Sequence, residues 1–111
     1  MNALNDNQYI VFHYSGIKFD TFDKSKCDGF WFTDIAPSDT EMLDETGAAD
    51  SVYCAKCIIT INEESEEIGN HEIFEQLEEN GCDGLIYNYD GFTDYAVSES
   101  SQIEVIEWSR I

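Results

Sequence analysis

Apolar residues of this chain gather in six short runs, separated by polar segments and by turns that contain glycine. Most runs are rich in β-branched and aromatic residues, the composition typical of β-strands. The runs lie at residues 9–13, 29–33, 51–61, within 82–91, at 92–98 and at 102–111. The pattern predicts about six strands, mostly antiparallel.

Two segments have the pattern of short helices. Residues 37–47 begin with Pro37, carry acids in the first turn and end at a glycine, as helices often do. Residues 71–81 place three apolar side chains, Ile73, Phe74 and Leu77, on one stripe. Gly81 follows that stripe and predicts a helix stop with glycine at the C′ position.

Two local signals refine the strands. Asp90–Gly91 separates two strand-like runs and predicts the turn of a β-hairpin. In the last run the apolar positions change face between Val105 and Ile106, which is typical of a β-bulge. We therefore expect one α+β domain over residues 1–111, with about six mostly antiparallel strands and two short helices.

The net charge of −19 sets the class of partner. So acidic a protein repels nucleic acid and anionic membranes, and it is attracted to basic surfaces, including the nucleic-acid grooves of other proteins. No apolar run reaches the roughly 20 residues of a membrane span. The first nine residues lack the basic and apolar regions of a signal peptide, so we expect a cytoplasmic protein.

The four cysteines do not predict a metal site. Cys54 and Cys57 have the spacing of a zinc half-site, but they lie in a strand-like run, where their side chains point to opposite faces. No second pair of this spacing exists, and His71 is the one histidine nearby. We expect reduced, buried cysteines and no bound metal.

The segment 12–34 gathers one of the two histidines, His13, with three of the five basic residues. These are Lys18, Lys24 and Lys26. A cluster of this kind suits an anionic ligand. The alternative is a set of counter-charges for the aspartates in the same segment.

Five stretches in order support a family resemblance: "VFHYSGIKFDTFD", "GFWFTD", "VYCAKCIITI", "LEENGCDGLIYNYDG" and "YAVSESSQIEVIEW". The chain resembles the small ADP-ribosyltransferase domains found in phage polyvalent proteins and related bacterial toxins. The likeness extends from Val11 to Ile106. It implies an ADP-ribosyltransferase-like fold, with NAD as the substrate.

The resemblance also implies roles for individual residues. His13 corresponds to the family's first-strand histidine, which contacts the adenosine-side ribose of NAD, with Ser15 in support. Trp31 or Phe32 stacks on the nicotinamide, and Thr33 donates a hydrogen bond to it. The lysines near His13 then offset the charge of the pyrophosphate.

The catalytic acid is less clearly matched. The family carries a polar residue late in the chain, where Gln102 stands, and an acid there stabilises the positive charge that develops on the ribose. Glu104 shares a strand face with Gln102 and can stand in for that acid. The family's helix tyrosine has no counterpart in residues 36–47, and Cys82 replaces another tyrosine.

Two functions follow. The first is an NAD-dependent mono-ADP-ribosyltransferase of phage or mobile-element origin that modifies a host defence protein, for example of a CRISPR complex. The alternative is a catalytically degenerate, acidic nucleic-acid mimic, an anti-CRISPR type of inhibitor that occludes a nucleic-acid-binding defence complex. Its acids lie in residues 62–80 and 34–50, which contain no lysine or arginine. In both cases the partner is a basic or nucleic-acid-binding protein, and nucleic acid itself is not bound.

Overall fold

Seven strands form one mixed sheet in this computed structural model, which describes residues 4–16, 22–23, 30–39, 41, 53–65, 73–89 and 91–110. The strands are β1 (Gln8–Ser15), β2 (Phe30–Thr33), β3 (Tyr53–Thr60), β4 (Glu64–Ser65), β5 (Gly84–Asn88), β6 (Thr93–Val97) and β7 (Ile103–Arg110). Helix α2 (Ile73–Glu79) precedes β5, and the 3-10 turn η3 (Ser100–Gln102) precedes β7. The spatial order is β4-β5-β6-β2-β1-β3-β7.

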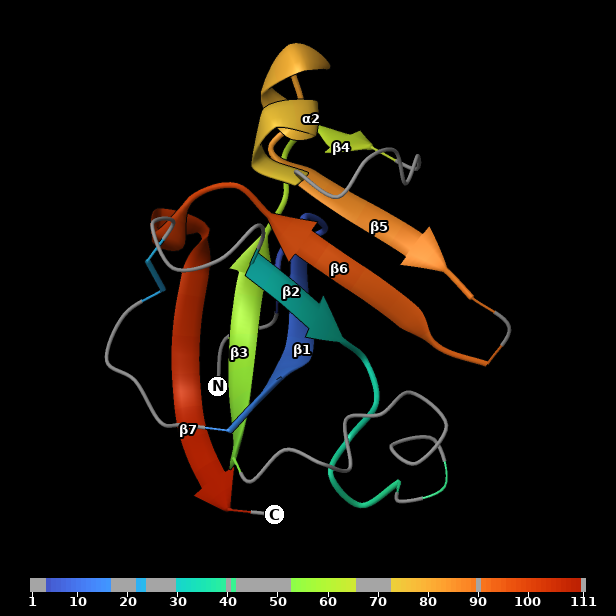
Figure 1. Ribbon diagram of the computed structural model, residues 1–111, viewed down its shortest axis with the longest axis vertical. Coiled ribbons are helices and arrows are strands. Elements are labelled where there is room, and N and C mark those ends of the chain that lie inside the picture. Colours follow the sequence, from blue (N-terminus) through green and yellow to red (C-terminus); the bar gives the residue numbers. More distant parts are fainter. Residues whose placement is uncertain are drawn as a thin grey trace.

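The sheet is divided into two halves (Figure 1). Strands β1, β3 and β7 run side by side, and β2, β6 and β5 cross them at a clear angle. The halves are joined between β1 and β2, where a single residue pair, Phe12 with Thr33, is in register. By contrast, all eight residues of β1 pair with β3. The joint between β1 and β2 is therefore the place where the sheet opens.

The main core lies between the two halves. Val11, Ala55, Cys57 and Ile59 come from β1 and β3, and they meet Phe30, Phe32 and Val97 from β2 and β6. A second cluster joins α2 to the other half of the sheet. It consists of Ile73 and Leu77 from α2 with Leu85 and Ala96 from β5 and β6.

Three local predictions are confirmed. The Tyr89 amide donates to the Phe92 carbonyl across a two-residue turn in which Gly91 has a φ of 100°. Gly81 ends α2 with a φ of 68°, and the amide of Cys82 donates to the Leu77 carbonyl as in a Schellman motif. The register of β7 against β3 shifts at Lys56–Cys57, so that Ile106 is the extra residue of a bulge.

The predicted α+β class is wrong, because the fold is mostly β. Three strands of eight residues dominate it, and helix α2 spans only seven residues at an end of the sheet. The count of six strands misses β4, which pairs in parallel with β5. The predicted helix at 37–47 falls mostly on residues outside the described part of the chain.

Membrane insertion by a helix has no support in the described part of the chain. No helix there is long and apolar enough to span a bilayer.

Candidate active site

His13 lies where the pairing between β1 and β2 ends. Its Nδ1 is 2.7 Å from the Trp31 carbonyl oxygen of β2. Because a carbonyl only accepts, the Nδ1–H must donate this bond. The imidazole thus provides the hydrogen bond that a backbone amide of β1 would supply if the two strands stayed paired.

The protonation state of His13 follows from its surroundings. Burial lowers its pKa below 6.5, and the hydrogen bond to Trp31 only partly opposes this effect. The ring packs edge-on against Phe22 and Phe32, with centroids 5.1 and 5.7 Å apart. His13 is therefore a neutral imidazole near pH 7, protonated on Nδ1, with Nε2 as an acceptor.

The two faces of β2 divide the aromatic residues predicted to bind NAD. Phe32 is buried and points into the core, where it meets His13. Trp31 and Thr33 alternate with it and share the opposite face, on which the Trp31 side chain is 36% exposed. Ser15 ends β1 two residues beyond His13 and is partly buried. The described residues thus bring the side chains of His13 and Phe32 together, while Trp31 meets His13 through its backbone carbonyl and its side chain lies on the other face.

Asp94 is a candidate that the sequence analysis does not contain. It lies on β6 directly opposite Thr33 of β2, and Thr33 in turn lies opposite Phe12 of β1. Adjacent strands are about 4.8 Å apart, so Asp94 is roughly 10 Å from β1 at the residue next to His13. Paired residues share a face and successive residues alternate, so the Asp94 carboxyl lies with Trp31 and Thr33 on the face opposite the His13 imidazole. The sequence contains a signal for this residue. "FTDYAV" is a strand-like run with a single acid, and pairing it with "GFWFTD" would have placed that acid opposite a threonine.

The carboxyl of Asp94 is perturbed. Burial raises its pKa, a hydrogen bond from the Thr33 side chain lowers it, and the nearby Asp34 carboxylate raises it. Asp34 itself accepts a hydrogen bond from the Thr93 amide at 3.0 Å. A partly buried acid with a shifted pKa is frequent at functional sites. His13, Trp31, Phe32, Thr33 and Asp94 are called the His13 cluster below.

Gln102 lies in a different environment. Its Nε2 donates to the carbonyls of Thr60 and Asp83, each at 2.8 Å. Its Oε1 accepts from the Ser98 amide, the Ser98 hydroxyl and the Glu99 amide, at 2.9 to 3.2 Å. Both donors and the acceptor of the side chain are engaged, which is the pattern of a structural residue. Gln102 and these partners are called the Gln102 cluster below.

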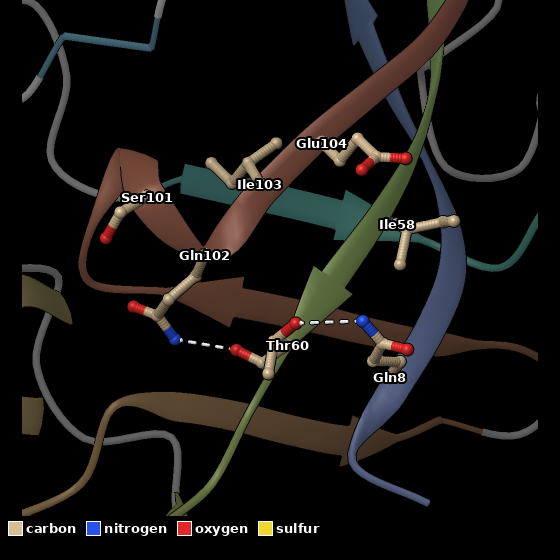
Figure 2. Close-up of a pocket in the computed structure, with 7 residues that line it drawn as sticks. All are labelled: Gln8, Ile58, Thr60, Ser101, Gln102, Ile103 and Glu104. Carbon is tan, nitrogen blue, oxygen red and sulfur yellow. Dashed lines mark hydrogen bonds between the residues drawn. The ribbon is translucent and has the colours of Figure 1, made fainter. Parts of the chain in front are cut away.

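A cavity of about 340 Å³ lies beside the Gln102 cluster (Figure 2). Its lining residues are Gln8, Ile58, Thr60, Ser101, Gln102, Ile103 and Glu104. Figure 2 shows Glu104 on β7 near Ile58 of β3, and Thr60 between Gln102 and Gln8. His13 and Phe32 do not line this cavity.

The predicted site residues therefore form two groups. Gln102 bonds to Thr60, and Thr60 is paired with Gln8 at the start of β1. Gln8 and His13 are five residues apart on the strand, or roughly 17 Å. The structure thus separates Gln102 and Glu104 from His13, while Asp94 lies closer to it.

The predicted burial of cysteines is confirmed for Cys54 and Cys57, whereas Cys82 is only partly buried. Cys57 is fully buried in the main core, and Cys54 is buried near Tyr14, away from that core. Burial raises the pKa of the Cys54 thiol to about 11 and that of Cys57 to about 12. Both are therefore protonated thiols at neutral pH. The three lysines near His13, and also Cys27 and His71, lie outside the described residues.

Comparisons with known proteins give no family for the chain. No model of a known protein family matches it, and no curated protein matches it significantly in sequence.

Proposed function

We propose that the His13 cluster binds NAD and transfers its ADP-ribose group to a protein of a bacterial host. The order of the sequence motifs supports this proposal. The observation that carries it is the placement of the acid Asp94 with Trp31 and Thr33 on one face of β2 and β6, next to the point where β1, the strand of His13, diverges from β2. Asp94 takes the acidic role in this proposal, in place of Gln102 or Glu104.

The chemistry assigns a task to each group. As the bond between nicotinamide and ribose breaks, nicotinamide leaves with the bonding electrons and positive charge develops on the sugar. The ionised carboxylate of Asp94 stabilises this charge, and partial burial strengthens the interaction. The exposed side chain of Trp31, on the same face as Asp94, orients the nicotinamide. Neutral His13 donates its Nδ1–H to the Trp31 carbonyl and so positions β2 for the ligand. The new bond then forms between the ribose carbon and a nucleophile of the target.

Calorimetry with NAD tests the binding step. We expect saturable binding by the wild type, loss of binding in His13→Ala, and near-normal binding in Asp94→Asn. Release of nicotinamide, followed by chromatography, should fall about 100-fold in Asp94→Asn, the usual cost of removing one group that stabilises charge in the transition state. Glu104→Gln is the matched control and should retain both properties.

Two results would count against this function. Absence of binding at millimolar NAD would exclude it. If Asp94→Asn did not affect nicotinamide release and Glu104→Gln abolished it, Glu104 of β7 and not Asp94 would be the acid that stabilises the charge on the ribose.

A second candidate function rests on the acids at one end of the molecule. Glu63 and Glu64 lie on the approach to β4 and in it, and α2 carries Glu75, Glu78 and Glu79, all exposed. Figure 1 shows β4 and α2 together at the end of β5. A surface of this charge supports occlusion of a basic nucleic-acid groove.

Charge reversal separates the two functions. Changing Glu63, Glu64, Glu66 and Glu67 to lysine should abolish inhibition by a mimic and leave NAD binding unchanged. Inhibition by a mimic should also weaken steeply as salt rises, because exposed charges are screened. His13→Ala should leave such inhibition intact.

A further inference from the structure

The half of the sheet formed by β1, β3 and β7 has a second face, directed away from the main core. Cross-strand pairing sets one row of this face as Ile10, Ile58 and Glu104. The next row is Phe12, Lys56 and Glu107. Paired residues point to the same side of a sheet, so the two rows form one surface. These six residues are called the outer face.

The outer face is unusually apolar for an exposed surface. Ile10 is 45% exposed, and Ile106, the bulged residue beside Glu107, is 46% exposed. Phe12 and Ile58 are partly buried. The described helix α2 packs on Leu85 and Ala96 of the other half of the sheet. Exposed apolar residues that adjoin one another mark an interaction surface more often than scattered ones do.

The charge of the outer face is arranged unevenly. Lys56 lies opposite Glu107, so one row contains both signs. Glu104, in contrast, lies opposite the uncharged Ile58. Glu104 also borders the cavity of Figure 2, together with the oxygen-bearing side chains of Gln8, Thr60 and Ser101. These groups suit an ammonium or guanidinium group, which is a hydrogen-bond donor with positive charge.

A partner could also bind by adding a strand to the edge of the sheet, but the residues of the edge strand disfavour this. β7 is the last strand in the sheet order. Exposed glutamates and a bulge in the strand are the features that prevent another strand from pairing with an edge. A partner is therefore expected on the outer face and not as an added strand.

We propose that the outer face is a docking surface for a basic, amphipathic segment of a partner protein. An apolar side chain of the segment covers Ile10 and Ile58, and a lysine or arginine reaches the cavity beside Glu104. A net charge of −19 disfavours a second copy of the chain as the occupant, because two copies repel each other. Phe12 of the outer face adjoins Thr33 of the His13 cluster, but Glu104 and the cavity lie at the other end of β1. This proposal therefore does not depend on NAD chemistry.

The probe is a synthetic helical peptide of leucine and lysine, added to isotope-labelled protein and followed by NMR. We expect saturable shifts of the backbone amides of Ile10, Ile58 and Glu104. A peptide with serine in place of leucine retains the charge and should bind far more weakly. Glu104→Gln should weaken binding about fivefold, the effect of one partly shielded ion pair. Glu78→Gln removes the same charge from α2 and should leave binding unchanged.

Stability and self-association measurements exclude the other occupants. Ile10→Ser should leave the melting temperature within about 2 °C of wild type, as expected for an exposed side chain. A much larger loss would mean that this chain itself covers the face, and would overturn the proposal. Analytical ultracentrifugation tests for self-association. If the wild type were a dimer and Ile10→Ser a monomer, the outer face would bind a second copy of this chain, and the proposal of a basic partner segment would be wrong. Peptide shifts confined to α2 and β4 would also overturn it, since they would show attraction by charge alone.

Discussion

The His13 cluster and the Gln102 cluster lie at opposite ends of β1, and they use polar side chains in different ways. At Gln102 the side-chain amide makes five hydrogen bonds to the chain segments around it. At the other end, burial lowers the pKa of His13 and raises that of Asp94, so each is held away from its ordinary titration range. A saturated amide stabilises a fold, whereas groups with shifted pKa values can serve chemistry. This comparison distinguishes a structural residue, Gln102, from candidate reactive residues, His13 and Asp94. Their positions in the sequence do not make that distinction.

The largest expected effect is on the Gln102 cluster. Gln102→Ala removes all five bonds and leaves the carbonyls of Thr60 and Asp83 without this donor. At about 1 kcal/mol for each bond, with some replaced by water, we expect a loss of about 3 kcal/mol in the free energy of unfolding. Urea denaturation at pH 7 measures it.

The conservative control for this position is Gln102→Glu. It keeps the acceptor but places a second acceptor against two carbonyls, so it should destabilise nearly as much. NAD binding per folded molecule should persist in both variants. If Gln102→Ala were as stable as the wild type but released no nicotinamide, Gln102 would be a reactive residue and not a structural one.

The next effect concerns His13. His13→Ala removes the bond to the Trp31 carbonyl and the contacts with two aromatic rings, for an expected loss of about 2 kcal/mol. His13→Asn has a side-chain amide that can replace the Nδ1–H donor, so it should lose about half as much. Thermal unfolding of the three proteins provides the test.

The pH dependence of stability sharpens the assignment of His13. Its folded pKa lies below 6.5, so the unfolded chain binds the proton more tightly. Wild-type stability should therefore fall as the pH drops below 6.5, and this component should vanish in His13→Asn. If the same slope persisted in the variant, His13 would not be its source.

The smallest effect has the opposite sign. The folded pKa of Asp94 is raised, so its ionised form opposes folding at neutral pH. Asp94→Asn should raise stability at pH 7, by less than about 1 kcal/mol because solvent screens this partly exposed group. The gain should shrink as the pH falls through the folded pKa and disappear near 3.8, where the wild-type carboxyl is also neutral.

Asp34→Asn is the matched comparison for Asp94. It should lower the pKa of Asp94 by removing a neighbouring negative charge, which NMR titration of the carboxyl carbon can follow. A destabilising Asp94→Asn at pH 7 would show that the carboxylate has a structural partner instead.

Local patterns in the sequence predicted the elements well where the signal itself is local. The β-branched and aromatic run at residues 51–61 contains β3. Gly91 and Gly81 have the positive φ that the predicted turn and helix stop require. The change of apolar face after Val105 predicted the bulge at Ile106. Each of these features depends on the conformational preferences of a few consecutive residues.

The tertiary structure alone decided the rest. β4 forms in an acidic segment because the Asp83 carboxylate binds the amides of Asn62 and Glu63, about twenty residues away in the chain. The same kind of long-range placement sets Asp94 beside Thr33 and separates Gln102 from His13. Sequence determined which residues form strands and turns and how acidic the protein is. Which polar side chains meet depends on strand order and register, and these are set by pairing between distant segments.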